Sequence, residues 1–285
     1  MLAKPLLQPK LLAFDLDGTL LNSKKELTVP TIRILQKSVS NGIKIVFASG
    51  RIKSSIDQYT RLCPFPVSVL SLNGAAVYSD QPSGQKRIYS ASLPHEYSDF
   101  LIDYSRKNKT LLNFYHEDTL FAIKNEDNLP WLALYIEQTR SMYTYLDSFQ
   151  SMTGVSPSKI IFVGQPEVLD RQQHYFTEKW GNTVYICRTW DYYLEFLNPL
   201  ANKAAGLSAL ADYYNISSEC VVSFGDAEND IPMLQYSGFS VAVQNAGEPV
   251  KKAAKKVSCW TNDQEAIEKE LNLIFQNHFK SYSNH

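Results

Sequence analysis

The sequence predicts an α/β protein with a doubly wound parallel-sheet core, into which a smaller α/β domain is inserted. Residues 11–14 and 43–48 are short apolar runs, which is typical of buried parallel strands, and a helical pattern separates them. A third apolar run, which ends at Gly225-Asp226, occurs late in the chain. Between the two halves lies an aromatic-rich segment of short alternating strands, which indicates a separate domain.

The first half of the core is expected to be a βαβ unit. Thr28 is suited to cap its helix, Pro30 lies near the first turn, and Asn41-Gly42 ends the helical pattern. Such a unit gives parallel strands, whose ligands sit at their carboxyl ends. The next expected elements are a helix and a strand, at residues 52–62 and 67–72.

A turn at residues 80–84 marks a change of character. We expect a core at 1–80 and 199–285 and an inserted domain at 81–198. The inserted domain is expected to contain helices and strands at 95–107, 111–115, 120–123, 131–140, 159–163, 167–180, 184–188 and 192–197. The core then resumes with elements at 204–213 and 239–243 and an amphipathic helix at 262–279.

Composition limits the classes of partner. The 285 residues are 44% hydrophobic and 20% charged, and Lys+Arg 28 against Asp+Glu 29 gives a net charge of −1. This balance argues against nucleic acid or an anionic membrane as a partner.

Four widely spaced cysteines adjoin apolar runs, and we expect them to be buried free thiols. Residues 1–10 lack a signal-like apolar run, so a cytoplasmic location is expected.

Two carboxylates follow the first apolar run. Asp15 and Asp17 are two residues apart in an extended segment, so both can face one site. Such a pair suits covalent catalysis, with one carboxylate attacking, the other moving a proton and a cation nearby. Gly18 allows a tight turn whose N–H groups can face an anion. A plain turn is the alternative; a calcium loop is not, because Thr-Leu-Leu follows Gly18.

Three later segments carry compatible groups. Ser49-Gly50 lies between a strand and a helix, where phosphate can bind, although a simple cap is equally consistent. Lys203 begins a helix and could neutralise a phosphate, or it could be an ordinary surface lysine. Asp226 ends the late strand and can supply an oxygen to a divalent cation.

Together these segments resemble the four motifs of the haloacid dehalogenase (HAD) superfamily, in order. The stretch 14–21, Ser49-Gly50-Arg51, Lys203 and Gly225-Asp226 followed by Asn229-Asp230 carry the resemblance. It is to Cof-like phosphatases, and it implies a Rossmann-like core, a C2B-type cap at 81–198 and Mg²⁺. The sequence departs from the family at Leu200, Ala204, Gln244 and Ala266, where glycines are usual.

The resemblance also implies a role for each motif residue. It makes Asp15, Asp17 and Lys203 catalytic and has Ser49, Gly50, Lys203 and Asn229 bind the substrate's phosphate. It has Mg²⁺ held by Asp15, the backbone carbonyl of Asp17, and Asp226. Asp230 is implied to orient Lys203 or a metal-bound water.

The implied activity is hydrolysis of a small phosphorylated metabolite, with sugar phosphates as the first expectation. A phosphomutase of the same superfamily and a non-catalytic phosphometabolite sensor are the alternatives. A dehalogenase needs neither the second aspartate nor the metal. Five residues of the inserted segment are candidates to contact the leaving group, although packing or solvent exposure is the favoured explanation for each: Tyr115, His116, Arg188, Trp190 and Tyr192.

Overall fold

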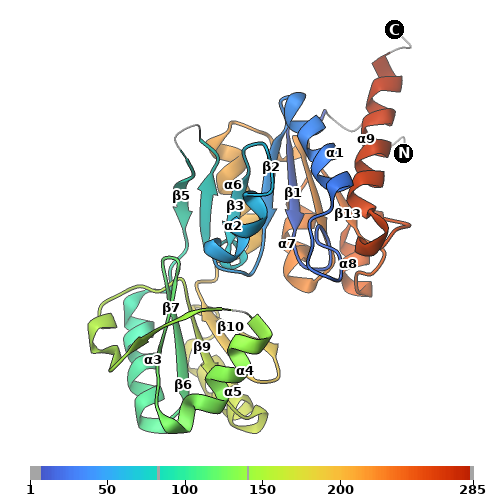
Figure 1. Cartoon of the computed structure of the whole chain (residues 1–285). Coiled ribbons are helices and arrows are strands. Elements are labelled where there is room, and N and C mark those ends of the chain that lie inside the picture. The colour runs from blue at the N-terminus through green and yellow to red at the C-terminus, as the bar shows by residue number, and fades with distance from the viewer. Residues whose placement is uncertain (1–7, 82–83, 140, 283–285) are drawn as a thin grey trace. The chain divides into compact units, whose positions relative to one another are not determined.

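The computed structural model describes residues 8–81, 84–139 and 141–282 (Figure 1). The chain forms two compact units, Met1–Tyr89 with Asn202–His285, and Ser90–Ala201. The turn expected at 80–84 includes residues 82 and 83, which lie outside the described part, as does most of the 1–10 segment. That the second unit is a cap domain stays a prediction.

The first unit is built on an eight-stranded sheet in the order β14-β13-β12-β1-β2-β3-β4-β5 (Figure 1). Neighbouring strands from β14 to β3 are parallel, whereas β4 is antiparallel to β3. The strands are β1 (Leu11–Asp15), β2 (Lys44–Ala48), β3 (Ser68–Ser71), β4 (Ala76–Ser79), β5 (Lys86–Ser90), β12 (Val221–Gly225), β13 (Phe239–Ala242) and β14 (Lys256–Val257).

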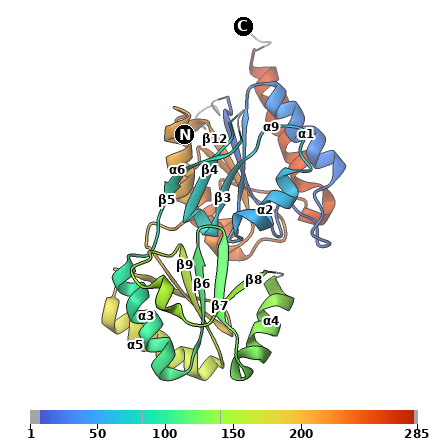
Figure 2. The same cartoon turned by 60° about the vertical axis from the view of Figure 1, so that its left-hand side comes forward.

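Helices cover both faces of this sheet, which explains its apolar strands (Figure 2). In β1, Leu12 and Phe14 pack toward α1, α2 and α9, while Leu11 and Ala13 pack toward α6 and α7. The helices are α1 (Val29–Ser40), α2 (Lys53–Thr60), α6 (Lys203–Tyr213), α7 (Ile231–Tyr236), α8 (Glu248–Ala253) and α9 (Ala266–Tyr282). Thr28 caps α1 as expected, accepting from the Thr31 N–H at 3.4 Å.

The strand order reverses between β1 and β12. From β1 the chain proceeds to β2 and β3 on one side, and from β12 it proceeds to β13 and β14 on the other. Asp15 pairs with Ala48 of β2, and Phe14 pairs with Phe224 of β12. The loops after these three strands therefore meet at a topological switch point, which is where open α/β sheets bind ligands.

The second unit has a six-stranded sheet in the order β10-β11-β9-β6-β7-β8. Its neighbouring strands are antiparallel, apart from the parallel pair β7 and β8. The strands are β6 (Leu111–His116), β7 (Thr119–Ile123), β8 (Tyr143–Leu146), β9 (Lys159–Val163), β10 (Tyr185–Trp190) and β11 (Tyr193–Leu197). The helices are α3 (His95–Asn108), α4 (Leu129–Thr139) and α5 (Pro166–Trp180).

Alternation along the strands separates an apolar face from a polar one. Phe114 and Phe162 face the core formed with α3 and α5. The opposite face carries Tyr115 and Lys159, which are paired across neighbouring strands. The Tyr115 hydroxyl lies 2.6 Å from that of Tyr135 on α4, and Lys159 binds Glu195 at 3.2 Å. The helix α4 therefore covers the polar face of this sheet.

The α/β fold class expected from the sequence is confirmed by the parallel core sheet and by the solved structures described below. The strands β4, β5, β8 and β14, which lie at or next to a sheet edge, were not expected, and β5 and β8 are largely exposed. The four cysteines are free as expected, but the expectation that they are buried is wrong, because Cys259 is exposed and the other three are only half-buried. Among the described helices, none is long and apolar enough to span a membrane.

The core of the second unit depends on Phe176. This fully buried ring contacts six other aromatic rings, at centroid distances of 4.8 to 6.3 Å: Phe100, Tyr104, Phe162, Tyr175, Trp180 and Phe196. We expect Phe176→Ala to lower the free energy of unfolding of this unit by about 3–5 kcal/mol, since it leaves a cavity. Val168→Ala, at an exposed position of the same helix, should change it by less than ~0.5 kcal/mol. Urea unfolding followed by tryptophan fluorescence measures both; equal effects would contradict the assignment.

Candidate active site

A fully buried lysine joins two of the predicted site residues. The Nζ atom of Lys203 donates to Asp15 Oδ1 and to Asp230 Oδ1, each at 2.5 Å. Asp15 is at the end of β1, and Asp230 follows β12 in the 3₁₀ helix Glu228–Asp230. Three segments distant in sequence thus meet through one cation.

Close backbone packing places Lys203 at the start of α6. Asn202 caps this helix by accepting from the Ala205 N–H at 2.9 Å. A Cβ atom on Gly74 would lie 2.4 Å from the Asn202 carbonyl oxygen, and one on Gly206 would lie 3.0 Å from the Gly74 Cα. The two glycines therefore let the loop after β3 pack directly against the beginning of α6.

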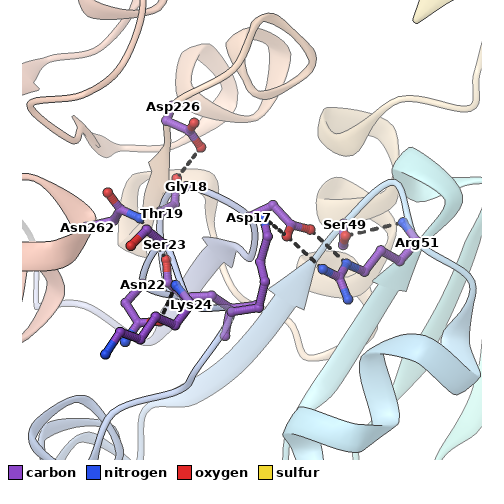
Figure 3. A network of polar contacts seen from close by, with 12 residues as sticks. Asp17, Gly18, Thr19, Asn22, Ser23, Lys24, Ser49, Arg51, Asp226 and Asn262 are labelled. Carbon is purple, nitrogen blue, oxygen red and sulfur yellow. Dashed lines mark hydrogen bonds and ion pairs between the residues drawn. The ribbon is translucent and has the colours of Figure 1, made fainter. Parts of the chain in front are cut away.

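Asp226 completes a group of three carboxylates. One oxygen from each of Asp15, Asp226 and Asp230 lies within 4.8 Å of the others. The Thr19 hydroxyl donates to Asp226 Oδ1 at 2.6 Å (Figure 3). The Asp226 and Ala227 N–H groups both donate to Asp230 Oδ2 at 3.0 Å, which fixes the turn after β12.

Burial and mutual repulsion shift the pKa values of Asp15 and Asp226. Burial raises the pKa of Asp15 well above its usual value, and the carboxylates of Asp230 and Asp226 add to the effect against Lys203. Burial also raises the pKa of Asp226. For Lys203 burial acts to lower the pKa, but Asp15 and Asp230 outweigh it and hold the pKa above its ordinary value.

The donor set fits a divalent cation. Asp230 has both oxygens engaged, by Lys203 and by two backbone N–H groups. Asp15 Oδ1 accepts from Lys203 and keeps a second lone pair for a metal, Asp226 Oδ2 also keeps lone pairs, and hard oxygen donors suit Mg²⁺. Adding positive charge here would relieve the repulsion among the carboxylates, so the residues present are compatible with a metal site.

Asp17 faces a different set of partners (Figure 3). Arg51 donates to both its oxygens, from Nε to Oδ2 and from Nη2 to Oδ1, each at 2.7 Å. Lys25 Nζ donates to Oδ1, also at 2.7 Å. Burial acts to raise the pKa of Asp17, but the hydrogen bonds from Arg51 and Lys25 outweigh it and lower the pKa. The two aspartates predicted as a pair therefore have opposite electrostatic environments.

The predicted phosphate-binding residues lie at the ends of β2 and β12. Ser49 is buried at the end of β2, and its Oγ accepts from the Arg51 N–H at 3.2 Å. Asn229 donates from Nδ2 to Asn73 Oδ1 at 2.9 Å, and that same oxygen would lie 3.2 Å from a Cβ on Gly50. Asn73 thus links the Ser49 loop to the loop of Asn229.

The sequence analysis assigned no role to four residues that contact this site: Thr19, Lys25, Arg51 and Asn73. Thr19 and Arg51 belong to motifs already identified, so their positions were a usable signal. Lys25 lies in a Lys-Lys pair that resembles ordinary surface charge, and its contact with Asp17 depends on a turn that the pattern does not reveal.

Within the second unit, several candidate contact residues already have internal partners. Tyr115 is buried, with its hydroxyl against that of Tyr135. Arg188 donates from Nη1 to Asp170 Oδ1 at 2.8 Å. Trp190 stacks on Tyr193 at 5.8 Å between centroids. Each of these three side chains therefore has a partner within the second unit, although Trp190 is 49% exposed.

Comparison with known families is consistent with this geometry. The family of haloacid dehalogenase-like hydrolases matches residues 12–271. The match covers most of the chain, and the chain belongs to this family. The resemblance expected from the four motifs is confirmed.

Individual relatives refine the class. The chain is 26% identical over 273 residues to the 5-amino-6-(5-phospho-D-ribitylamino)uracil phosphatase of Bacillus subtilis, covering 94% of this chain and 98% of that protein. It is 28% identical to a haloacid dehalogenase-like hydrolase structure from Bacteroides thetaiotaomicron, with a TM-score of 0.83 and coverage of 94% and 100%. A Thermotoga maritima structure is also 28% identical, with a TM-score of 0.84 and coverage of 93% and 97%. These similarities place the chain among the phosphatases of the family.

Removing the buried lysine should destabilise the protein. We expect Lys203→Met to lower the free energy of unfolding by about 3–5 kcal/mol, because Asp15 and Asp230 lose their shared cation in a buried place. Mg²⁺ should restore part of this loss by supplying positive charge nearby. Thermal unfolding with and without Mg²⁺ measures both effects, with Lys24→Met as an exposed control. A Lys203→Met protein as stable as the wild type would contradict this account.

Two glycines with positive φ provide a matched test of the turn beside Asp226. Gly18 has φ 84° and Gly42 has φ 78°, so alanine at either costs roughly 1–2 kcal/mol of backbone strain. At Gly18 the new Cβ would also lie 2.4 Å from Asp226 Oδ2, whereas at Gly42 nothing lies within 4 Å. We expect Gly18→Ala alone to weaken Mg²⁺ binding, measured by calorimetry. Equal affinities in the two variants would count against a metal at Asp226.

Proposed function

We propose that the chain is a Mg²⁺-dependent phosphomonoester hydrolase that acts through an aspartyl phosphate. The observation that carries the proposal is the fully buried Lys203 between Asp15 and Asp230 at the switch point of a parallel sheet. A buried lysine beside a strand-end carboxylate is costly for stability alone, and it suits a site where negative charge develops.

Asp15 is the proposed nucleophile. One of its oxygens is held by Lys203 at 2.5 Å, which leaves the other free to attack phosphorus. The bond from Asp15 to phosphorus forms as the bond to the leaving oxygen breaks. Lys203, Ser49 and the N–H groups near Gly50 are proposed to bind the phosphoryl oxygens, with Asn229 at the edge of the site.

Asp17 is the proposed general acid and base. It would protonate the leaving oxygen in the first step and take a proton from the attacking water in the second. In that second step the bond from water to phosphorus forms as the bond from Asp15 to phosphorus breaks and inorganic phosphate leaves, so one difficult displacement is split into two. The carboxylates of Asp15 and Asp226, with the backbone carbonyl of Asp17, would hold Mg²⁺. When bound, Mg²⁺ neutralises charge on the phosphoryl group and the nucleophile. Asp230 is proposed to orient Lys203, consistent with its contacts.

The proposed substrate is a small phosphorylated metabolite, with sugar phosphates first. The Bacillus subtilis relative is named for a substrate with phosphate on a ribityl chain, which is a sugar-derived polyol. The second unit, near residues 81–198, is proposed to be the cap that selects the leaving group. The cytoplasmic location and the absence of nucleic-acid or membrane partners stay predictions from the sequence.

The test is phosphate release from a panel of phosphorylated metabolites, with Mg²⁺ and with excess EDTA. We expect metal-dependent release by the wild type and none above background from Asp15→Asn, which removes the nucleophile but keeps its shape. The folded state of the variant is checked by circular dichroism. Isomer formation without free phosphate would instead indicate a phosphomutase. A folded wild type that binds metal but turns over nothing would indicate a sensor.

A further inference from the structure

Three hydrogen bonds converge on the carboxylate of Asp17. Oδ1 accepts from Lys25 Nζ at 2.7 Å. Arg51 donates from Nη2 to Oδ1 and from Nε to Oδ2, also at 2.7 Å (Figure 3). A carboxylate has about four lone-pair sites, so Oδ1 is saturated and Oδ2 keeps one. The plane of the carboxylate is fixed by the two-pronged Arg51 contact, since both prongs must be satisfied together.

A turn that is stabilised by its own hydrogen bonds, at residues 22–26, places Lys25 beside Asp17. Asn22 Oδ1 accepts from the N–H groups of Lys24 and Glu26, at 3.0 and 2.9 Å. The Lys25 N–H donates to the Asn22 carbonyl at 2.9 Å, and Lys25 itself has φ 62°. This left-handed conformation is uncommon for lysine, and the hydrogen bonds of the turn maintain it.

Hydrogen bonds also anchor this turn to the C-terminal part of the same unit. The Ser23 N–H donates to Asp263 Oδ1 at 2.7 Å, and Asn262 Nδ2 donates to the Leu21 carbonyl at 3.0 Å. Arg51 is fixed independently, because its backbone N–H donates to Ser49 and its carbonyl accepts from the Leu72 N–H at 2.9 Å. Both cations therefore come from anchored segments.

We propose that Lys25 and Arg51 are positioning residues that clamp Asp17 and leave Oδ2 as the oxygen that exchanges the proton with the leaving group. An isolated pair with Lys25, which is 53% exposed, would contribute little to stability. The same hydrogen bonds lower the pKa of Asp17, which by itself opposes a role as an acid. The contribution of the two cations is therefore orientation, because proton transfer needs the donor oxygen within hydrogen-bond reach of the leaving oxygen, and we expect the loss of orientation to outweigh any gain from a higher pKa. The inference rests on the proposed function and deepens it.

The clamp makes a prediction that depends on the leaving group. An alkyl phosphate releases a strongly basic alkoxide, which needs the proton from Asp17 as the P–O bond breaks. p-Nitrophenyl phosphate releases a stable phenolate, which leaves without that proton. Mispositioning Asp17 should therefore slow the first substrate much more than the second.

The experiment compares kcat on both substrates for the wild type and four variants of the full chain. Lys25→Asn removes the charge while tolerating the left-handed conformation, and Lys24→Asn is the control on the same turn. Arg51→Lys keeps the charge but loses the two-pronged contact, and Asp17→Asn removes the acid itself. We expect Lys25→Asn and Arg51→Lys to lower kcat on the alkyl phosphate about tenfold or more, within the ~10²–10⁴ that general acid catalysis supplies. The loss on p-nitrophenyl phosphate should be several-fold smaller, and Lys24→Asn should resemble the wild type.

The outcomes separate this inference from the proposed function. Equal losses on both substrates, or no loss for Lys25→Asn, would overturn the clamp and leave the phosphatase assignment intact. No turnover by the wild type would overturn the proposed function and the clamp with it. Lys25→Arg, which retains the charge, should restore most of the lost alkyl-phosphate activity; failure to restore it in a folded protein would also overturn the clamp.

Discussion

The ion pairs of the buried Lys203 with Asp15 and Asp230 are the interaction on which the rest of the first unit depends. A buried cation is tolerated only where its partners are held in place, and here each partner is fixed by a different element. Asp15 ends β1, and Asp230 is held by two backbone N–H groups after β12. The parallel sheet thus does more than bury apolar surface, because its register brings the two carboxylates to one lysine.

The loop after β3 shows what this arrangement costs. Leu72, Asn73 and Gly74 all have positive φ, at 50°, 57° and 89°, and such a conformation costs about 1–3 kcal/mol for a residue other than glycine. Two hydrogen bonds offset this strain, because the Leu72 N–H donates to the Arg51 carbonyl and the Asn73 N–H donates to the Ser49 carbonyl, at 2.9 Å each. The strained conformation lets Gly74 approach the start of α6, so the same loop fixes both Arg51 and the helix that carries Lys203.

The features that could be predicted from the sequence are those that depend on local patterns of residues. The core strands were predictable because burial on both faces gives continuous apolar runs, and Asp15, Lys203 and Asp226 were predictable because they end or begin such elements. The edge strands β5 and β8 were missed because much of their surface is exposed, so neither face is marked by an apolar pattern. The contact of Lys25 with Asp17 was missed for another reason. It depends on one left-handed residue and on hydrogen bonds to a loop over two hundred residues away.

Charge explains why the clamp and the metal site belong together. Four carboxylates and three cations, all among the described residues, take part in the contacts of the site: Asp15, Asp17, Asp226 and Asp230, with Lys25, Arg51 and Lys203. This set has one net negative charge, which would repel a phosphate dianion. A divalent cation between Asp15 and Asp226 would make the set positive. Because Lys25 and Arg51 already neutralise Asp17, the charge of such a cation would remain available to Asp15 and a bound phosphoryl group, and the proposed acid would stay separate from the proposed nucleophile.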